Sequence, residues 1–189
     1  NTLKQVLVDR DYQEVVTYSF VDQKFIELLT PEQKSVSLAN PISADMSEMR
    51  TTLWAGLLKT AMYNLNRQQN RIRIFETGLA FTTLNGLEQT PRIAGLICGP
   101  VTEENWFGKA QSADFFDIKG DVEALLNLTG GAGQYSFEAG SHPALHTGQT
   151  AVVKKAGQAI GFVGALHPLV QKNLDIQSKV YLYELVLAP

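Results

Sequence analysis

The sequence changes from a helical to a strand pattern at NRQQNRIRIFETG, residues 66–78. Arg67, Arg71 and Arg73 lie among amide side chains, and from Arg71 onward basic and apolar residues alternate, which predicts a half-buried strand with Arg71 and Arg73 on one face. Three interpretations are open: a nucleic-acid patch, the edge of an active site, or a helix end that leads into a sheet. A basic strip can hold phosphate, but charges in an acidic chain also form solvated or ion-paired faces.

The flanking segments extend this pattern into a helix and a hairpin. Before the stretch, apolar residues recur at helical spacing. They are Trp54, Leu57, Leu58, Ala61, Met62 and Leu65. After it, RIAGLICG (92–99) predicts an antiparallel return strand.

The remaining segments predict further strands with helices between them. A helix is expected over residues 2–9, another after Asp22, which can cap it, and a third over residues 114–131. Asp114 can cap that third helix, and Asp117 and Asp121 suit its positive end. Strands are expected over residues 14–21, 35–39, 134–139 and 180–187, with a polar loop over 42–52, a loop over 101–113, a hairpin over 149–166 and a helix that begins at Pro168. The pattern lacks βαβ regularity and predicts an α+β fold with a mostly antiparallel sheet in a single domain, residues 1–189.

The composition of the chain limits the classes of protein to which it can belong. The chain has 189 residues, 44% of them hydrophobic and 19% charged, with a formal net charge of −3. These values predict a globular domain without a global field that attracts polyanions. The single Cys98 lies in an apolar run and suits a reducing compartment. No apolar run approaches the ~20 residues of a spanning helix, and no signal peptide is evident. We expect a cytoplasmic protein, and, because the chain starts at Asn1 without a methionine, a domain excised from a longer one.

Residues that could carry chemistry are few. His142 and His146 are four residues apart, but Pro143 and nearby glycines indicate a loop, and no further ligands lie at a usual spacing. We therefore expect these two histidines and His167 to hydrogen-bond to loop backbone instead of holding a metal. The glycines of residues 130–133 follow a helix and predict a helix stop, not a phosphate loop.

The second half of the chain lacks arginine. No arginine follows Arg92, and the basic residues beyond it are all lysines. A mechanism that needs a planar two-pronged cation in this half, such as one that clamps a triphosphate, has no residue to supply it.

Several long motifs, in order, resemble the family of bacterial-type phenylalanyl-tRNA synthetase beta subunits. They are EVVTYSF, NPISADMSEMRTTLWAGLLKTAMYNLNRQQNRIRIFETG, DFFDIKGDVEALL, HPALHTGQ and GFVGALHP. The resemblance covers essentially the whole chain and implies the catalytic-like domain of that subunit. It also implies the class II aminoacyl-tRNA synthetase fold, an antiparallel sheet flanked by helices.

The resemblance also implies that catalytic motifs have degenerated. Residues 2–21 look like a remnant of the first class II motif. The two strands of the second motif are similar to RIRIFETGLAF and RIAGLICG, but Thr82-Thr83 replaces the arginine that would hold the α-phosphate, and residues 93–99 contain no acidic residue. The final VYLYELVLAP has neither the glycine nor the arginine of the third motif. We therefore expect no catalytic, cofactor-binding or metal-binding residue in this chain.

By resemblance, the domain serves assembly. It would pair with the catalytic alpha subunit in a heterotetramer of two alpha and two beta chains, which uses ATP and magnesium to attach phenylalanine to its tRNA. We expect Leu3, Val6 and Leu7 of the first helix to form an interface, and their apolar face to be partly exposed in the isolated domain or covered by self-association. Two alternatives are open: a tRNA or subunit contact through Arg67, Arg71 and Arg73, and a residual small-molecule or ATP pocket with a regulatory role.

Overall fold

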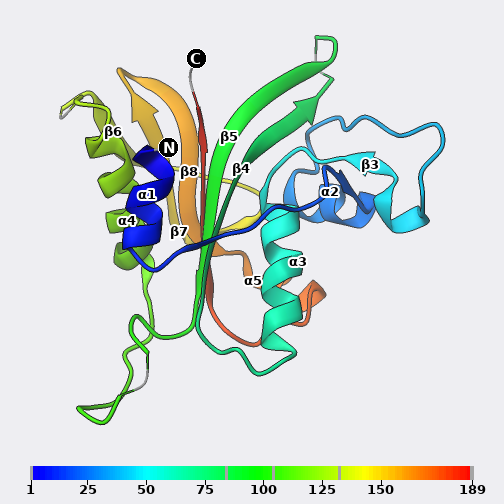
Figure 1. The fold of residues 1–189 in the computed structure, drawn as a ribbon. Helices are drawn as coiled ribbons and strands as arrows, with labels where there is room; N and C mark the ends of the chain where they lie inside the picture. Colours follow the sequence, from blue (N-terminus) through cyan, green and yellow to red (C-terminus); the bar gives the residue numbers. More distant parts are fainter. Residues whose placement is uncertain (1, 84, 104, 132, 188–189) are drawn as a thin grey trace.

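A seven-stranded sheet forms the centre of the protein (Figure 1). The computed structural model describes residues 2–83, 85–103, 105–131 and 133–187. The strand order is β1-β4-β5-β9-β8-β7-β6, and neighbours are antiparallel except for the parallel edge pair β1–β4. The strands are β1 (Gln13–Glu14), β4 (Ile72–Thr82), β5 (Glu88–Cys98), β6 (Tyr135–Ala139), β7 (Leu145–Lys155), β8 (Gln158–Leu166) and β9 (Val180–Val186).

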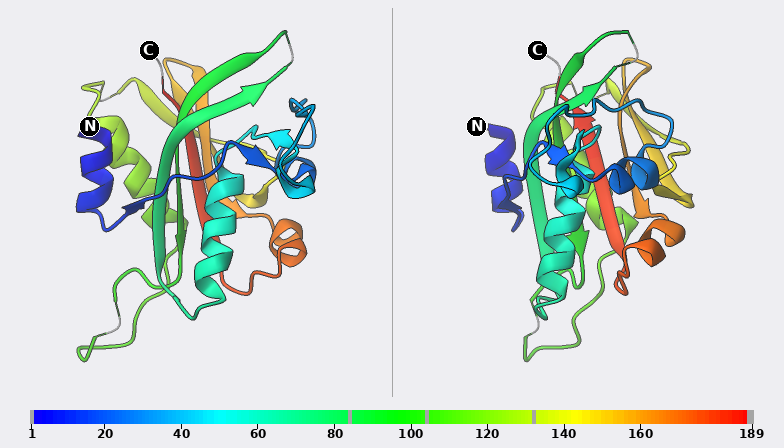
Figure 2. Two further views of the ribbon diagram at one scale, coloured as in Figure 1. Left: turned by 45° about the vertical axis from the view of Figure 1, so that its right-hand side comes forward. Right: turned by 90° about the vertical axis from the view of Figure 1, so that its right-hand side faces the viewer.

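Helices cover both faces of this sheet (Figure 2). One face carries α1 (Thr2–Asp9) and α4 (Phe115–Asn127), and the other carries α2 (Gln23–Leu29), α3 (Trp54–Leu65) and α5 (Pro168–Asn173). Each face has its own buried apolar cluster. The expected α+β class, an antiparallel sheet flanked by helices, is confirmed. None of the described helices is long and apolar enough to cross a membrane.

The long β4–β5 hairpin connects the two cores. Side chains alternate along it, so Ile74 and its cross-strand partner Leu96 face α3, whereas Phe75 is buried on the α4 side. Burying such a side chain contributes roughly 1.5–3 kcal/mol. The prediction of a half-buried β4 is wrong, because Phe75 and Glu76 are buried next to each other on opposite faces.

The segment before α3 departs most from the predictions. Residues 14–21 do not form one strand: β1 ends at Glu14, and β2 (Phe20–Val21) pairs with β3 (Glu48–Met49) in a separate two-stranded sheet. Between them the Thr17 amide and hydroxyl donate hydrogen bonds to the Glu76 carboxylate, so a side chain takes the place of a strand partner.

Two further expectations for this segment are corrected. The strand predicted over residues 35–39 reduces to an isolated bridge between Ser37 and Glu48, and the Glu48 carboxylate accepts hydrogen bonds from the hydroxyls of Ser35 and Ser37. The polar loop predicted over residues 42–52 contains a short 3-10 helix, η1 (Ala44–Met46), and ends in buried residues.

The predicted capping residues cap their helices, but one acidic residue predicted for the start of α4 lies elsewhere. The Asp22 and Asp114 side chains accept backbone N–H groups at the starts of α2 and α4, and Asp117 completes a capping box. Asp121, predicted to favour the helix's positive end, lies instead in the middle of α4 with its side chain buried against the sheet.

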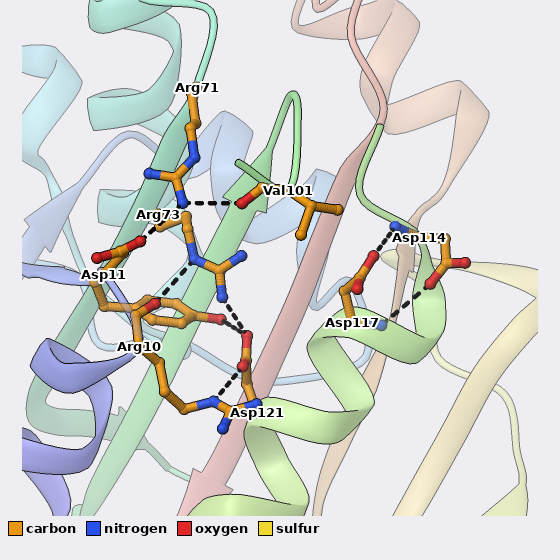
Figure 3. A network of polar contacts seen from close by, with 9 residues as sticks. Arg10, Asp11, Arg71, Arg73, Val101, Asp114, Asp117 and Asp121 are labelled. Carbon is orange, nitrogen blue, oxygen red and sulfur yellow. Dashed lines mark hydrogen bonds and ion pairs between the residues drawn. The ribbon is translucent and has the colours of Figure 1, made fainter. Parts of the chain in front are cut away.

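The Asp121 carboxylate holds α1, β4 and α4 together (Figure 3). It accepts hydrogen bonds from Arg10 Nε at 2.6 Å, from an Arg73 guanidinium nitrogen at 2.8 Å and from the Tyr12 hydroxyl at 2.6 Å. Burial raises the pKa of Tyr12 well above its usual value, which keeps the hydroxyl protonated as a donor. A buried carboxylate needs such partners because its desolvation is costly.

The apolar face of α1 lies against this chain's own core. Leu7 is 0% exposed, and Leu3 and Val6, which are partly buried, pack against the same cluster as α4. The apolar face of α1 is therefore partly exposed, as expected, because Leu3 and Val6 keep some exposed surface while Leu7 is covered by this chain's own core. That these three residues form an interface stays a prediction.

We predict that Asp121→Asn lowers the free energy of unfolding by about 3 kcal/mol, because two guanidinium groups lose their common counter-charge. The matched control is Glu123→Gln on the same helix, whose side chain is 46% exposed and forms an ion pair with Lys119. It should cost no more than about 0.5 kcal/mol. Urea denaturation of both variants checks this, and equal losses would contradict the assigned role.

Candidate functional site

Three central strands present a charged and aromatic cluster on the α3 side of the sheet. Glu184 on β9 stands directly opposite Phe162 on β8 and is buried. Its carboxylate accepts a hydrogen bond from Arg92 of β5 at 2.8 Å and another from the Thr52 hydroxyl, just before α3. The same Arg92 nitrogen reaches the Thr51 carbonyl at 3.3 Å. The Arg92 guanidinium is therefore already engaged by a carboxylate of its own chain.

Aromatic rings fill the space beside this ion pair. The His142 imidazole contacts Trp54 and Phe162 edge to face, with ring centroids 5.0 and 4.9 Å apart. Trp54 Nε1 donates a hydrogen bond to the Tyr183 carbonyl at 2.9 Å. Burial, and secondarily the positive charge of Arg92, lower the pKa of His142 to about 4, so the ring is neutral at pH 7.

The cavity left between these groups is about 180 Å³. Binding sites for cofactors and drug-sized ligands occupy roughly 300–1,000 Å³. Arg92 and the aromatic rings line this cavity, and the Arg92 guanidinium is already bonded to Glu184. The residues present do not fit a nucleoside triphosphate with its magnesium, and no catalytic step on ATP can be derived from them.

Another arginine, Arg50, is bound in a similar way. Arg50 is paired with Glu76 at 2.8 Å, and these side chains are 5% and 2% exposed. Its Nε also donates to the Leu79 carbonyl, and it passes so close to Gly78 that a Cβ there would lie 2.3 Å from a guanidinium nitrogen. Glycine at position 78 therefore leaves room for the buried ion pair.

The question raised by the stretch at residues 66–78 now has an answer for two of its arginines. Arg73 binds Asp121 and lies over the Tyr12 ring, and its side chain is 9% exposed (Figure 3). Arg71 binds the Asp11 carboxylate at 3.2 Å and the Val101 carbonyl at 3.0 Å. Both arginines form internal contacts between segments of this chain.

Arg67 differs from these arginines. Within the described residues it has no carboxylate partner, and its guanidinium lies 3.4 Å from the ring centroid of Tyr63, one turn earlier in α3. Both side chains are exposed. Of the arginines proposed for a tRNA or subunit contact, Arg67 is the one that the structure leaves at the surface.

The histidines make the backbone hydrogen bonds that the sequence predicts. Nδ1 of His142, His146 and His167 accepts an N–H from the residue two positions later, in each case near 3 Å. His167 thereby caps α5. Among the described residues, no group of three or more His, Cys, Asp or Glu side chains could hold a metal ion.

Sequence reasoning missed the buried ion pairs. Glu76 lies in the apolar run of β4 and Glu184 in that of β9, and each is nearly inaccessible. A carboxylate within an apolar strand is itself the signal, because charged side chains are almost never buried unless they are paired. What the sequence could not supply is the partner, since Arg50 and Arg92 are distant along the chain.

The fold is similar to that of a pyrrolysyl tRNA synthetase from Desulfitobacterium hafniense. The TM-score is 0.72 over 97% of this chain and 61% of that chain, at 16% sequence identity. At this identity the likeness concerns the fold alone. The architecture is thus that of a class II aminoacyl-tRNA synthetase, and on the α3 side of the sheet Arg92 is engaged by Glu184.

Residues 1–187 match the family described as "Phenylalanyl tRNA synthetase beta chain CLM domain", and the chain belongs to this family. Proteins named "Phenylalanine--tRNA ligase beta subunit" are 56% identical in Hahella chejuensis, 51% in Pseudomonas syringae pv. tomato and 54% in Nitrosococcus oceani. Each alignment covers 98% of this chain but 23–24% of the relative. The chain therefore spans about a quarter of the length of these relatives.

The lowered pKa of His142 predicts an acid-sensitive fold. Below pH 6.5 the unfolded imidazole takes up a proton that the folded one resists until about pH 4, so stability is lost as the pH falls through this window. The loss should approach about 3 kcal/mol at pH 4. In His142→Gln the unfolding free energy should fall less steeply between pH 7 and pH 4. Parallel pH profiles for the variant and the natural protein would refute this.

Proposed function

We propose that this chain is a non-catalytic assembly domain of a phenylalanine–tRNA ligase beta subunit. In this proposal it pairs with the catalytic alpha subunit in a cytoplasmic holoenzyme that attaches phenylalanine to its tRNA with ATP and magnesium. The observation that carries the proposal is the use of arginines: Arg50, Arg73 and Arg92 are each bound to a buried carboxylate of the same chain.

The chemistry of adenylate formation explains why this observation matters. Charge develops on the transferring phosphorus and on the leaving pyrophosphate, and fixed cations must stabilise it more strongly in the transition state than in the ground state. Each lost contact typically costs about 10²–10³ in rate. An arginine that already neutralises a buried carboxylate cannot turn to a phosphate without leaving that charge unpaired.

A surface suited to a partner lies between α3 and the segment before α2. Here a hollow of about 380 Å³, which we call the apolar groove, is lined by Val16, Tyr18, Lys59 and Tyr63 among others. Val16 is 90% exposed, Tyr18 75% and Tyr63 57%. Contiguous exposed apolar side chains of this kind mark protein interfaces, in which tyrosines often supply much of the binding energy. We assign the alpha subunit to this groove.

The first helix, α1, has a smaller role in the proposed contact with the alpha subunit. Leu3 and Val6 retain some exposed surface, whereas Leu7 is fully buried and can contact a partner only if α1 detaches. We therefore place the main alpha-subunit contact in the apolar groove. The heterotetramer of two alpha and two beta chains remains part of the proposal.

A tRNA contact is the second candidate function, and one observation favours it. Arg67 is exposed beside the Tyr63 ring, and an arginine with a neighbouring aromatic ring can bind phosphate and stack on bases. Arg71 and Arg73 could join such a contact only by giving up bonds to Asp11 and Asp121. The net charge of −3 also opposes a main role in binding RNA.

The apolar groove is tested by Val16→Ser combined with Tyr18→Ser in the full-length beta subunit. We expect its affinity for the alpha subunit to fall about tenfold or more, because two exposed anchors are lost. Leu169→Ser, which removes a 64% exposed side chain from α5, is the control and should bind normally. Titration of purified subunits gives the dissociation constants, and unchanged pairing of the double variant would overturn the assignment.

A further inference from the structure

The cavity of about 180 Å³ beside the Arg92–Glu184 ion pair is lined by two residues that each carry an unpaired buried polar atom. Gln33 Oε1 and Arg92 Nε are buried, and neither has a hydrogen-bond partner within the described part of the chain. The other buried atoms of this kind, on Arg71 and Tyr183, belong to residues that do not line the cavity. Because buried polar groups are normally paired, two unpaired ones at one cavity point to a partner that enters it.

The size of the cavity suits a single ring. A cavity of about 150 Å³ with apolar walls can hold one benzene molecule. The cavity here, at about 180 Å³, therefore has room for a six-membered ring with one small substituent. Ala159 and Val186 line it and are exposed, so a ligand can enter from solvent where β8 begins and β9 ends.

The walls of the cavity are largely aromatic and aliphatic. Trp54, His142 and Phe162 contribute rings, and Ile160 contributes an aliphatic side chain. An ordered water molecule needs two to four polar partners, which such walls do not supply over most of the volume. A planar ring packs favourably against aromatic side chains, either stacked or edge to face. The walls therefore favour a flat organic ligand over a cluster of water molecules.

The charges around the cavity are balanced and select a neutral ligand. Its charged lining residues, Arg92 and Glu184, pair with each other at 2.8 Å. His142 Nδ1 accepts the Ala144 N–H at 3.0 Å, and the low pKa of about 4 leaves this ring uncharged at pH 7, with its proton on Nε2. An anion or a cation in the cavity would have to compete with an ion pair that is already formed and largely desolvated.

The two unpaired atoms specify the polar groups of the ligand. Arg92 Nε carries a hydrogen and needs an acceptor, whereas Gln33 Oε1 is an acceptor and needs a donor. A carboxamide supplies both, because its C=O and its NH₂ lie in one plane on the same carbon atom. A pyrimidine base carries the same two kinds of group on its ring.

We propose that this cavity binds a neutral, planar, single-ring molecule with an amide-type pair of acceptor and donor. The acceptor of the ligand takes the Arg92 Nε–H, its donor binds Gln33 Oε1, and its ring packs against Trp54 and Phe162. The site is not an ATP site, because the Arg92 guanidinium stays bound to Glu184 throughout. It also makes no use of the alpha subunit, so it is independent of the proposed function.

The test titrates nicotinamide and cytosine into the full-length beta subunit and follows binding by ligand-observed NMR. At least one of them should bind saturably, with a dissociation constant of about 1 mM or below. The better probe distinguishes a ring carboxamide from a pyrimidine base. Nicotinate, in which a negative oxygen replaces the amide NH₂, should bind about tenfold more weakly than nicotinamide or not at all. Gln33→Leu should weaken the better probe about three- to tenfold, because it removes the acceptor.

Three further variants locate the binding and control for folding. Gln33→Leu should leave urea denaturation unchanged, because the oxygen that it removes has no partner in the fold. Ala159→Trp, which narrows the opening, should abolish binding, whereas Gln89→Leu, the same change at an exposed position of β5 outside the cavity, should bind normally.

The proposal is wrong if neither probe binds, if nicotinate binds as well as nicotinamide, or if Gln33→Leu and Ala159→Trp both bind normally. None of these results bears on pairing with the alpha subunit, so the proposed function stands or fails separately.

Discussion

A carboxylate buried between a sheet and a helix must be neutralised by fixed cations, and this constraint shapes the whole domain. Asp121 is 2% exposed and binds Arg10, Arg73 and the Tyr12 hydroxyl, which joins α1, β4 and α4. Glu76 and Glu184 repeat the arrangement on the opposite face of the sheet with Arg50 and Arg92. Removing one partner from such a pair leaves an uncompensated buried charge, which is strongly destabilising.

The same constraint also bears on whether this fold can activate an amino acid. A class II scaffold that activates an amino acid needs guanidinium groups free to meet phosphate oxygens as charge develops on them. Here Arg92 is bonded to Glu184, and the neutral His142 ring fills part of the space between Trp54 and Phe162. Arg50, Arg73 and Arg92 instead pair with buried carboxylates of the same chain, which is why we propose a role in assembly and not in catalysis.

The sequence predicted those features that depend on local patterns. The period of α3, the capping residues Asp22 and Asp114, and the β4–β5 hairpin all follow from short-range rules. The predictions failed where a distant side chain overrides the local preference. The β-branched segment around Thr17 bonds to Glu76 instead of extending a strand. Asp121 was predicted to favour the positive end of its helix, but in the fold its carboxylate binds Arg73 of the sheet. The motifs predicted that certain cations are missing, but only the folded arrangement shows that Arg50 and Arg92 are bound to carboxylates.

The most direct test of this account is phenylalanine-dependent exchange of labelled pyrophosphate into ATP by the polypeptide without any partner. A cooperative unfolding transition of the same preparation would establish that it is folded. The account predicts no exchange above that of a blank without protein, because Arg92 and Arg50 remain bound to carboxylates. Exchange that requires phenylalanine and disappears in Arg92→Ala would contradict it and would identify this sheet face as a working active site.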